Sequence, residues 1–343
     1  MTPRERIFAA INFEKTDRAP CDITEGRIWP DLDNYFEREH GLHNRDEILN
    51  FLDTDIRWIE PTFTNTDLVT TSRDTVSCST GPLANAETVE EVTKGYESAY
   101  ANFFGGNDTN VFCEIDYAAF RKKWPDHAVA LIPFAVPYFW ESCSQFGMDE
   151  VFFRIHDKPE LYEALLKVSH TRSMRNLTDF IGKSGGCADI LLLWDDVAGQ
   201  NGMMVDPGWW RETIKPYLKK EVDFIHAHGL KVFYHSCGAV RPIIKDFIDI
   251  GIDVFTVFQA NARDMEPGSI AREFGGRICF YGGMEVQYLL SYGSVAEVEA
   301  QVAHNLESFR GCGGYITANC HSQMDTIKGE NIVAMCRAAK NFR

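Results

Sequence analysis

The sequence predicts an α/β protein, and a (β/α)₈ barrel is the architecture that it favours. In the second half, short and continuous apolar runs alternate with amphipathic helical patterns, which is typical of parallel strands covered by helices. Glycines mark the ends of the helical patterns, as C-caps require. The expected strands are 188–194, 231–234, 253–258, 278–281 and 315–318, and the expected helices are 207–228, 240–250, 269–274, 294–310 and 328–342.

The first half is less regular. It supplies the remaining three of the eight strand–helix (βα) units that a (β/α)₈ barrel requires. We expect a helix over 3–13, a first strand over 19–23, another strand over 131–139 and a long helix over 160–181. Residues 60–127 are rich in Thr, Asn, Asp and Gly, and predict an irregular or antiparallel insertion over the barrel mouth. Three units before Gly186 and five after it give eight, so residues 1–343 form one barrel domain with an N-terminal extension. A doubly wound open sheet is the alternative, although no glycine-rich phosphate fingerprint follows a strand.

Composition narrows the functional classes. The chain has 343 residues and a formal charge of −16, which argues against binding to nucleic acid or to anionic membrane surfaces. The most apolar stretch, 128–140, is too short to cross a bilayer, and the charged start lacks the apolar core of a secretory signal. We therefore expect a cytoplasmic enzyme whose ten cysteines are reduced thiols.

The residues with the clearest chemistry are His235, Cys237 and Cys320. Each follows a predicted strand, and on a barrel the carboxyl ends of all strands face one mouth. One imidazole and two thiolates suit Zn²⁺ and leave a fourth position free, as in catalytic zinc sites. The alternative is two buried structural cysteines and a strand-end histidine. His321 is left out of the predicted ligand set, because adjacent residues at a strand end normally diverge.

Other strand-end residues are candidates for the same mouth. Asp195 and Asp196 could support His235 or deliver a proton, and at most one of them is expected to point inward. Glu285 is a candidate general acid, and Glu25 or Glu285 a candidate labile fourth zinc ligand. The expected substrate-binding residues combine hydrogen-bonding groups with an aromatic lining, and they are Glu25, Phe134, Tyr138, Trp194, Phe258 and Gln259.

Several of these segments together resemble the uroporphyrinogen decarboxylase superfamily, over nearly the whole chain. The resemblance lies in 16–20 (TDRAP), 194–196 (WDD), 235–238 (HSCG) and Cys320 ahead of 329–332 (GENI). The His-x-Cys element with a distant third Cys resembles its corrinoid-dependent methyltransferase branch, which includes methylcobamide:coenzyme M methyltransferases and components of O-demethylases. That branch implies a (β/α)₈ barrel with zinc on His235, Cys237 and Cys320.

The resemblance also implies an activity and a partner. We expect methyl transfer between a small substrate and the cobalt of a cobalamin carried by a separate corrinoid protein that binds transiently; a homodimer is compatible with the sequence. The aromatic content favours an aryl methyl ether as substrate over coenzyme M or another thiol. Uroporphyrinogen decarboxylation is a further alternative, but residues 21–28 contain one arginine where a polyanion would need several. A chaperone of a corrinoid protein, or a module that binds an aromatic ligand, would not need three metal ligands.

Overall fold

The computed structural model describes residues 1–28, 30–60, 81–103, 115–133, 135–321 and 326–342. Seven strands form one parallel sheet in the order β1-β2-β3-β6-β7-β8-β9. Their bounds are β1 Ile56–Ile59, β2 Ala128–Leu131, β3 Ile190–Trp194, β6 Lys231–His235, β7 Val254–Phe258, β8 Cys279–Met284 and β9 Tyr315–Asn319. A small antiparallel pair, β4 Ala198–Gly199 and β5 Gly202–Met203, follows β3.

The eighth position of the barrel is filled by the segment around Cys21. Cys21 forms a single parallel bridge with Thr317 of β9, and the backbone of Asp22 donates to the Thr317 carbonyl at 2.9 Å. On its other side, the Cys21 carbonyl accepts from the backbone of Asp55, just before β1, also at 2.9 Å. These bonds join the two edge strands of the curled sheet, so the predicted barrel architecture, with three units before Gly186 and five after it, is confirmed.

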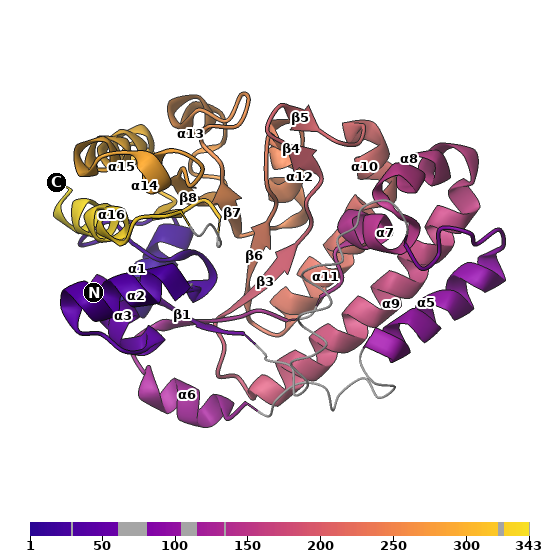
Figure 1. Ribbon diagram of the computed structural model, residues 1–343, viewed down its shortest axis with the longest axis horizontal. Coiled ribbons are helices and arrows are strands. Elements are labelled where there is room, and N and C mark those ends of the chain that lie inside the picture. Colours follow the sequence, from indigo (N-terminus) through magenta and orange to yellow (C-terminus); the bar gives the residue numbers. More distant parts are fainter. Residues whose placement is uncertain (29, 61–80, 104–114, 134, 322–325, 343) are drawn as a thin grey trace.

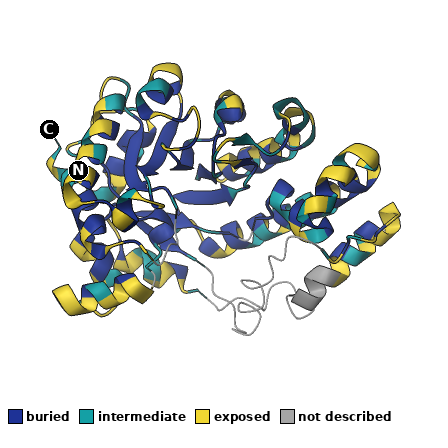
Figure 2. Cartoon of the chain, turned by 45° about the horizontal axis from the view of Figure 1, so that its top comes forward, coloured by how far each residue is buried: buried dark blue, intermediate teal, exposed yellow. Residues whose placement is uncertain are grey.

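Helices cover the outside of the sheet (Figure 1). In the described part of the chain they are α1 Pro3–Ile11, α2 Pro30–His40, α3 Arg45–Leu52, α5 Val89–Phe103, α6 Tyr117–Lys123, α7 Tyr138–Phe146, α8 Met148–Asp157, α9 Pro159–Ser184, α10 Pro207–Thr213, α11 Lys215–Ala227, α12 Arg241–Ile250, α13 Pro267–Phe274, α14 Leu289–Tyr292, α15 Val295–Phe309 and α16 Gly329–Asn341. A 3₁₀ turn, η1, spans Thr24–Gly26. Figure 2 shows the strands buried at the centre and the helices exposing their outer faces.

The core has an inner and an outer layer. Inside the barrel, Trp58, Phe233 and Tyr281 pack edge to face, with ring centroids 5.9–6.5 Å apart. The outer layer lies between strands and helices, where Phe258 and Phe280 pack against Phe309 of α15. This two-layer arrangement follows from strand alternation, since successive side chains point to opposite faces of the sheet.

One prediction about the first half is wrong, and another is only partly covered by the described residues. In the described part of 60–127 the regular elements include the helices α5 and α6, which both pack against α9. The stretch 75–79, predicted to alternate as a strand, lies outside the described residues. The strand expected over 131–139 ends at Leu131, and Tyr138 begins α7. Pro133 and Pro137 explain the early end, because proline cannot donate to a strand ladder.

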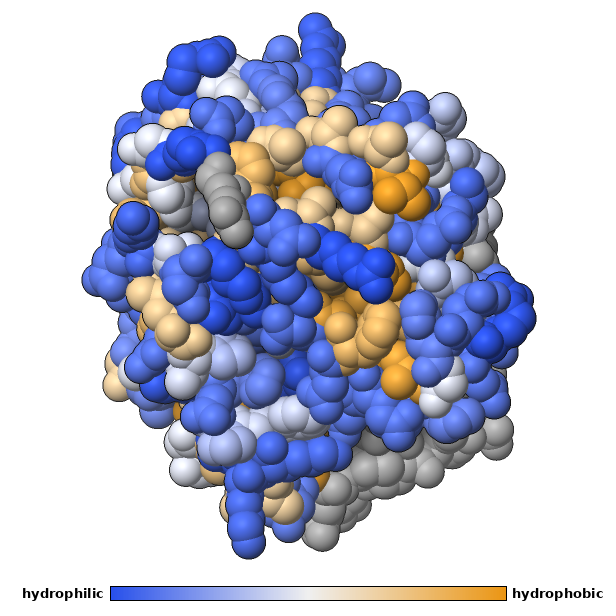
Figure 3. All heavy atoms as spheres, turned by 90° about the vertical axis from the view of Figure 1, so that its left-hand side faces the viewer, coloured by the Kyte–Doolittle hydropathy of each residue, from blue (hydrophilic) through white to orange (hydrophobic). Residues whose placement is uncertain are grey.

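The outer surface mixes polar and apolar areas. The face that carries the terminal helices is largely hydrophilic, with patches of apolar residues among them (Figure 3). Phe51 and Val295 are among the exposed large apolar side chains of the described residues, at 39% and 40% exposure. None of the helices in the described part of the chain is long and apolar enough to cross a membrane.

Barrel closure rests on a buried carboxylate, which gives a first testable prediction. Asp55 is fully buried and accepts hydrogen bonds from Arg6, from Arg18 and from the backbone of Cys21. Asp55→Asn removes the charge that the two guanidinium groups neutralise, so we expect the free energy of unfolding to fall by about 3 kcal/mol. The midpoint of urea unfolding measures the effect.

Asp53→Asn is the matched control, because Asp53 also pairs with Arg18 but is 53% exposed. An exposed ion pair contributes at most about 1 kcal/mol. Equal losses in the two variants would contradict the assigned role of Asp55.

Candidate metal centre

The carboxyl end of β6 carries the predicted His-x-Cys element, and the structure brings its two donor atoms together. Nε2 of His235 lies 3.6 Å from Sγ of Cys237. Among the described residues, one group of three His, Cys, Asp or Glu side chains has ligand atoms all within 4.8 Å of one another: His235, Cys237 and His321. An imidazole, a thiol and a second imidazole are the donors that zinc prefers.

The neighbouring residues hold both donors in place. Nδ1 of His235 lies 3.0 Å from Oε1 of Glu25, which leaves Nε2 on the side of Cys237. Asp196 accepts from the backbone N–H of Cys237 at 2.8 Å, and its Oδ1 is 3.8 Å from Nε2 of His235. A carboxylate on the far nitrogen of a histidine fixes the ring and raises its basicity, as in carboxylate–histidine–zinc arrangements.

The electrostatics of the centre favour positive charge. Burial disfavours the imidazolium form of His235, but its contacts with Cys237 and Glu25 and the charge of Asp196 outweigh burial and raise its pKa well above the usual value. Burial likewise opposes the charged form of Glu25, yet His235 and Arg27 together lower its pKa. A place that stabilises an imidazolium stabilises a metal cation by the same interactions.

Of the neighbours Cys320 and His321, the structure places His321 in the group of three, whereas the sequence predicted Cys320. Cys320 is outside the group of three. Burial is the main cause that raises the pKa of Cys320 to about 12. His321, which was expected to diverge, lies with its ring centroid 6.2 Å from that of His235. Strand β9 ends at Asn319, so the alternation of a strand no longer separates these two residues.

Asn319 is a residue of this region that the sequence did not single out. Its Oδ1 accepts from the backbone of Thr24 at 3.0 Å, and its Nδ2 donates to the carbonyl of His321 at 2.6 Å. It thereby ties the turn that carries Glu25 to the segment that carries His321. Glu25 itself has a left-handed backbone, with φ 57°, which a non-glycine residue adopts only when its surroundings enforce it. No sequence pattern at Asn319 marked this role.

Of the paired acids, Asp196 is the one that contacts the centre. Asp195 turns away and accepts from the backbone N–H groups of Phe139 and Trp140, at 2.8 and 2.9 Å, so it caps the first turn of α7. The catalytic role expected for Asp195 is therefore replaced by a structural one. Glu285 is also occupied, because it accepts from the backbone of Tyr288 and Leu289 at the start of α14.

Two of the expected substrate-binding aromatic residues lie elsewhere. Tyr138 is 2% exposed and its hydroxyl donates to Glu221 of α11 at 2.7 Å, so it points between the outer helices. Phe258 is fully buried in the outer layer against Phe280. Both predictions are wrong, since Tyr138 begins a helix and Phe258 faces outward on its strand. Phe134 lies outside the described residues.

Gln259 and Trp194 border the centre from the two strands beside β6. Oε1 of Gln259 accepts from the backbone of Gly238 at 3.0 Å and from Gln200 at 2.8 Å, so it braces the loop after Cys237. Trp194 lies directly beside His235 in the sheet register. Gly238 has φ 84°, and a Cβ there would lie 2.5 Å from the Gly199 carbonyl, so this loop requires glycine.

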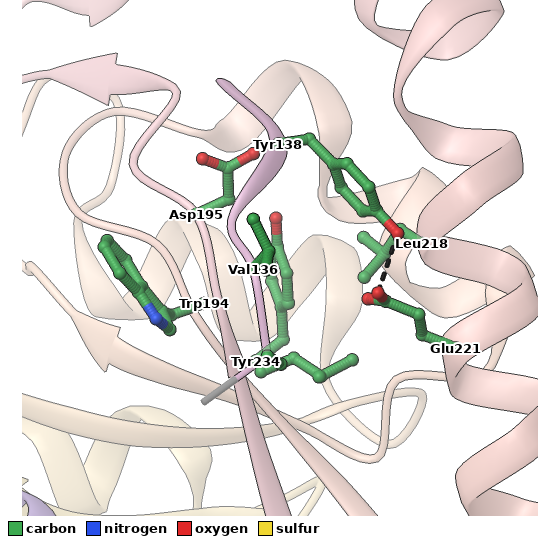
Figure 4. A pocket seen from close by; sticks show the side chains of 9 residues that line it. Val136, Tyr138, Trp194, Asp195, Leu218, Glu221 and Tyr234 are labelled. Atoms are coloured by element: carbon green, nitrogen blue, oxygen red, sulfur yellow. Dashed lines mark hydrogen bonds between the residues drawn. The ribbon is translucent and has the colours of Figure 1, made fainter. Parts of the chain in front are cut away.

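A small cavity lies between the strands β3 and β6 and the outer helices α7 and α11, and it is too small for a substrate. Figure 4 shows Trp194, Asp195 and Tyr234 on one side and Tyr138 with Glu221 on the other. The cavity holds about 10 Å³, which is room for about one water molecule. Burial raises the pKa of Asp195 and of Glu221 to about 7.

The contact between Glu25 and His235 gives a prediction about metal binding. Glu25→Gln keeps the size of the side chain but removes the charge that supports His235, so we expect zinc affinity to fall about 10–100-fold. Competition with a chromogenic chelator measures it.

Glu60→Gln is the matched control, because Glu60 shares Arg27 with Glu25, and we expect wild-type affinity for it. Unchanged zinc affinity in Glu25→Gln would show that Glu25 does not support the ligand.

Comparison with known proteins agrees with this fold. The solved structures that match include a methyltransferase from Methanosarcina mazei, with a TM-score of 0.62 and 17% sequence identity, over 99% of this chain and 98% of that chain. No curated protein matches the sequence. The family model of uroporphyrinogen decarboxylase (URO-D) matches residues 127–342, which is more than half of the chain. The chain therefore belongs to the uroporphyrinogen decarboxylase family.

Proposed function

We propose that this protein is a zinc-dependent methyltransferase that moves a methyl group between a small substrate and the cobalt of a corrinoid held by a partner protein. The observation that carries the proposal is the convergence of His235 and Cys237, 3.6 Å apart, at the carboxyl end of a barrel strand. The whole-length likeness to a methyltransferase from Methanosarcina mazei supports it as a matter of fold.

The donor set of this chain fits zinc. We propose His235, Cys237 and Cys320 as ligands, with His321 beside them. Two thiolates and one imidazole would make the centre neutral, and the buried surroundings would favour neutrality. A bound zinc ion would supply a Lewis acid for the oxygen or sulfur atom that carries or receives the methyl group.

The residues around the ligands would have defined tasks. Glu25 would hold the proton on Nδ1 of His235, so that the lone pair of Nε2 stays available to bind the metal. Asp196 would fix the backbone of Cys237 through its hydrogen bond, and its side chain is 23% exposed. That position suits proton transfer to or from the substrate heteroatom.

The decarboxylase alternative is weakened by the state of Arg27. A porphyrinogen carries many carboxylates and needs cationic groups that are not already neutralised. Arg27 is the one arginine of residues 21–28, and it pairs with Glu25 at 3.1 Å and with Glu60 at 2.7 Å. With both carboxylates beside it, Arg27 offers little positive potential to a polyanion.

For the substrate we propose an aryl methyl ether, because phenolate leaves more readily than alkoxide. A thiol that accepts the methyl group is the second candidate, and one observation favours it. Tyr138 and Phe258, two of the aromatic residues expected around an aryl group, lie in the outer layers of the fold. Trp194, beside His235, is the remaining aromatic residue of the expected set among the described ones.

The corrinoid would have to come from a partner. Methyl transfer needs the reacting atoms within about 3–3.5 Å, so the partner would press its corrinoid against the loops of the barrel mouth. The formal charge of −16 suggests an association that is steered by charge, transient and sensitive to salt.

A turnover test separates the candidate substrates. The purified zinc protein is incubated with reduced cobalamin and methoxyphenols, with methylcobalamin and thiols, and with uroporphyrinogen. We expect demethylation of methoxyphenols, with the cobalamin spectrum as readout, and loss of activity by at least about a thousandfold in Cys237→Ala, since removing a ligand removes the Lewis acid.

Faster reaction of a thiol with methylcobalamin would replace the aryl ether by the second candidate. Turnover of uroporphyrinogen alone would overturn the methyltransferase proposal.

A further inference from the structure

His321 is placed where a fourth ligand of the centre would lie. It follows Cys320 directly, and its ligand atom is within 4.8 Å of those of both His235 and Cys237. Ligand atoms around a tetrahedral zinc ion are about 3.3–3.8 Å apart, as bond lengths of about 2.0–2.3 Å require. A contraction of about 1 Å would therefore bring all three donors to one ion.

The backbone holds His321 toward the centre. Asn319 donates to the His321 carbonyl and accepts from the backbone of Thr24, so the segment after β9 is tied to the turn that carries Glu25. Since Glu25 contacts His235, one network positions both histidines. The two rings lie at an interplanar angle of 76°, and a ligand atom of each lies within 4.8 Å of one of the other.

We propose that His321 is a fourth, exchangeable protein ligand of the metal: it completes the coordination in the substrate-free protein and gives up its place when substrate binds. This inference rests on the proposed function, because an exchangeable ligand has a purpose only at a catalytic metal.

The charges and contacts of the four donors explain why His321 would be the one that leaves. Cys237 and Cys320 supply the two negative charges that neutralise the metal. His235 is braced by the carboxylate of Glu25, which strengthens it as a ligand. His321 is a neutral donor, so its exchange for a neutral ether leaves the charge of the centre unchanged, whereas a thiol would bind as the thiolate and release its proton.

The test uses the full-length protein with Zn²⁺ or Co²⁺ alone and with 2-mercaptoethanol as the probe. In His321→Ala, we expect zinc affinity without probe to fall by at least about tenfold, because one of four ligands is lost. We also expect a changed Co²⁺ absorption spectrum, and mercaptoethanol binding that is at least about tenfold tighter than in wild type, because the probe no longer competes with the imidazole.

Two further variants keep the test decisive. His321→Gln retains a polar side chain of similar length and should reproduce the loss if His321→Ala folds poorly, with far-UV circular dichroism as the check on folding. His304→Gln is the control, because His304 is an exposed histidine that pairs with Glu266 away from the described centre, and it should behave as wild type.

The outcomes separate this inference from the proposed function. If wild-type protein binds zinc, and the His321 variants match it in zinc affinity, Co²⁺ spectrum and probe binding, His321 is not a ligand and only this inference fails. If folded wild-type protein does not bind zinc, the proposed function fails, and this inference with it.

Discussion

The closure of the barrel is the constraint on which the rest of the structure depends. The segment 20–22 has hydrogen bonds to β9 on one side and to the start of β1 on the other, and buried Asp55 links it to two arginines. This closure carries Glu25, three residues further on, to His235, which is 210 positions away in the chain. Without closure, neither the brace on His235 nor the tie through Asn319 would form.

The centre also illustrates how a buried site manages charge. Glu25, Arg27 and Glu60 form a row of alternating charge that leads from His235 outward. Asp196 adds a second carboxylate on the other side of the imidazole. Buried charges are tolerated only when they are paired, so a centre that raises the pKa of His235 well above its usual value and also gathers thiols is balanced best by a cation.

The fold could be predicted from the sequence because the same pattern, an apolar strand followed by an amphipathic helix, is repeated along the second half of the chain. Five successive units with continuous apolar strands leave few alternatives to a parallel sheet, and strand-end positions then follow from one rule. The convergence of His235 and Cys237 was predictable on that basis. The strand β1 was harder to recognise, because it has only four residues and includes Arg57.

The predictions that were wrong concern residues whose positions depend on tertiary contacts. Nothing near Asp195 in sequence shows that its carboxylate caps a helix that begins at Tyr138, and the same holds for Glu285 at α14. At His321 the strand has already ended, and Asn319 donates a hydrogen bond to the carbonyl of His321. Residue type identified the candidate donors, whereas hydrogen bonds over long sequence distances decided which of them meet.

The central claim is that His235 and Cys237 bind a metal ion at the mouth of this barrel. Metal analysis combined with X-ray absorption at the zinc edge tests it most directly on the purified, substrate-free protein. The account predicts one zinc ion per chain, with sulfur ligands at about 2.3 Å and nitrogen ligands at about 2.0–2.1 Å. Folded protein without stoichiometric zinc, or zinc surrounded by oxygen alone, would contradict it.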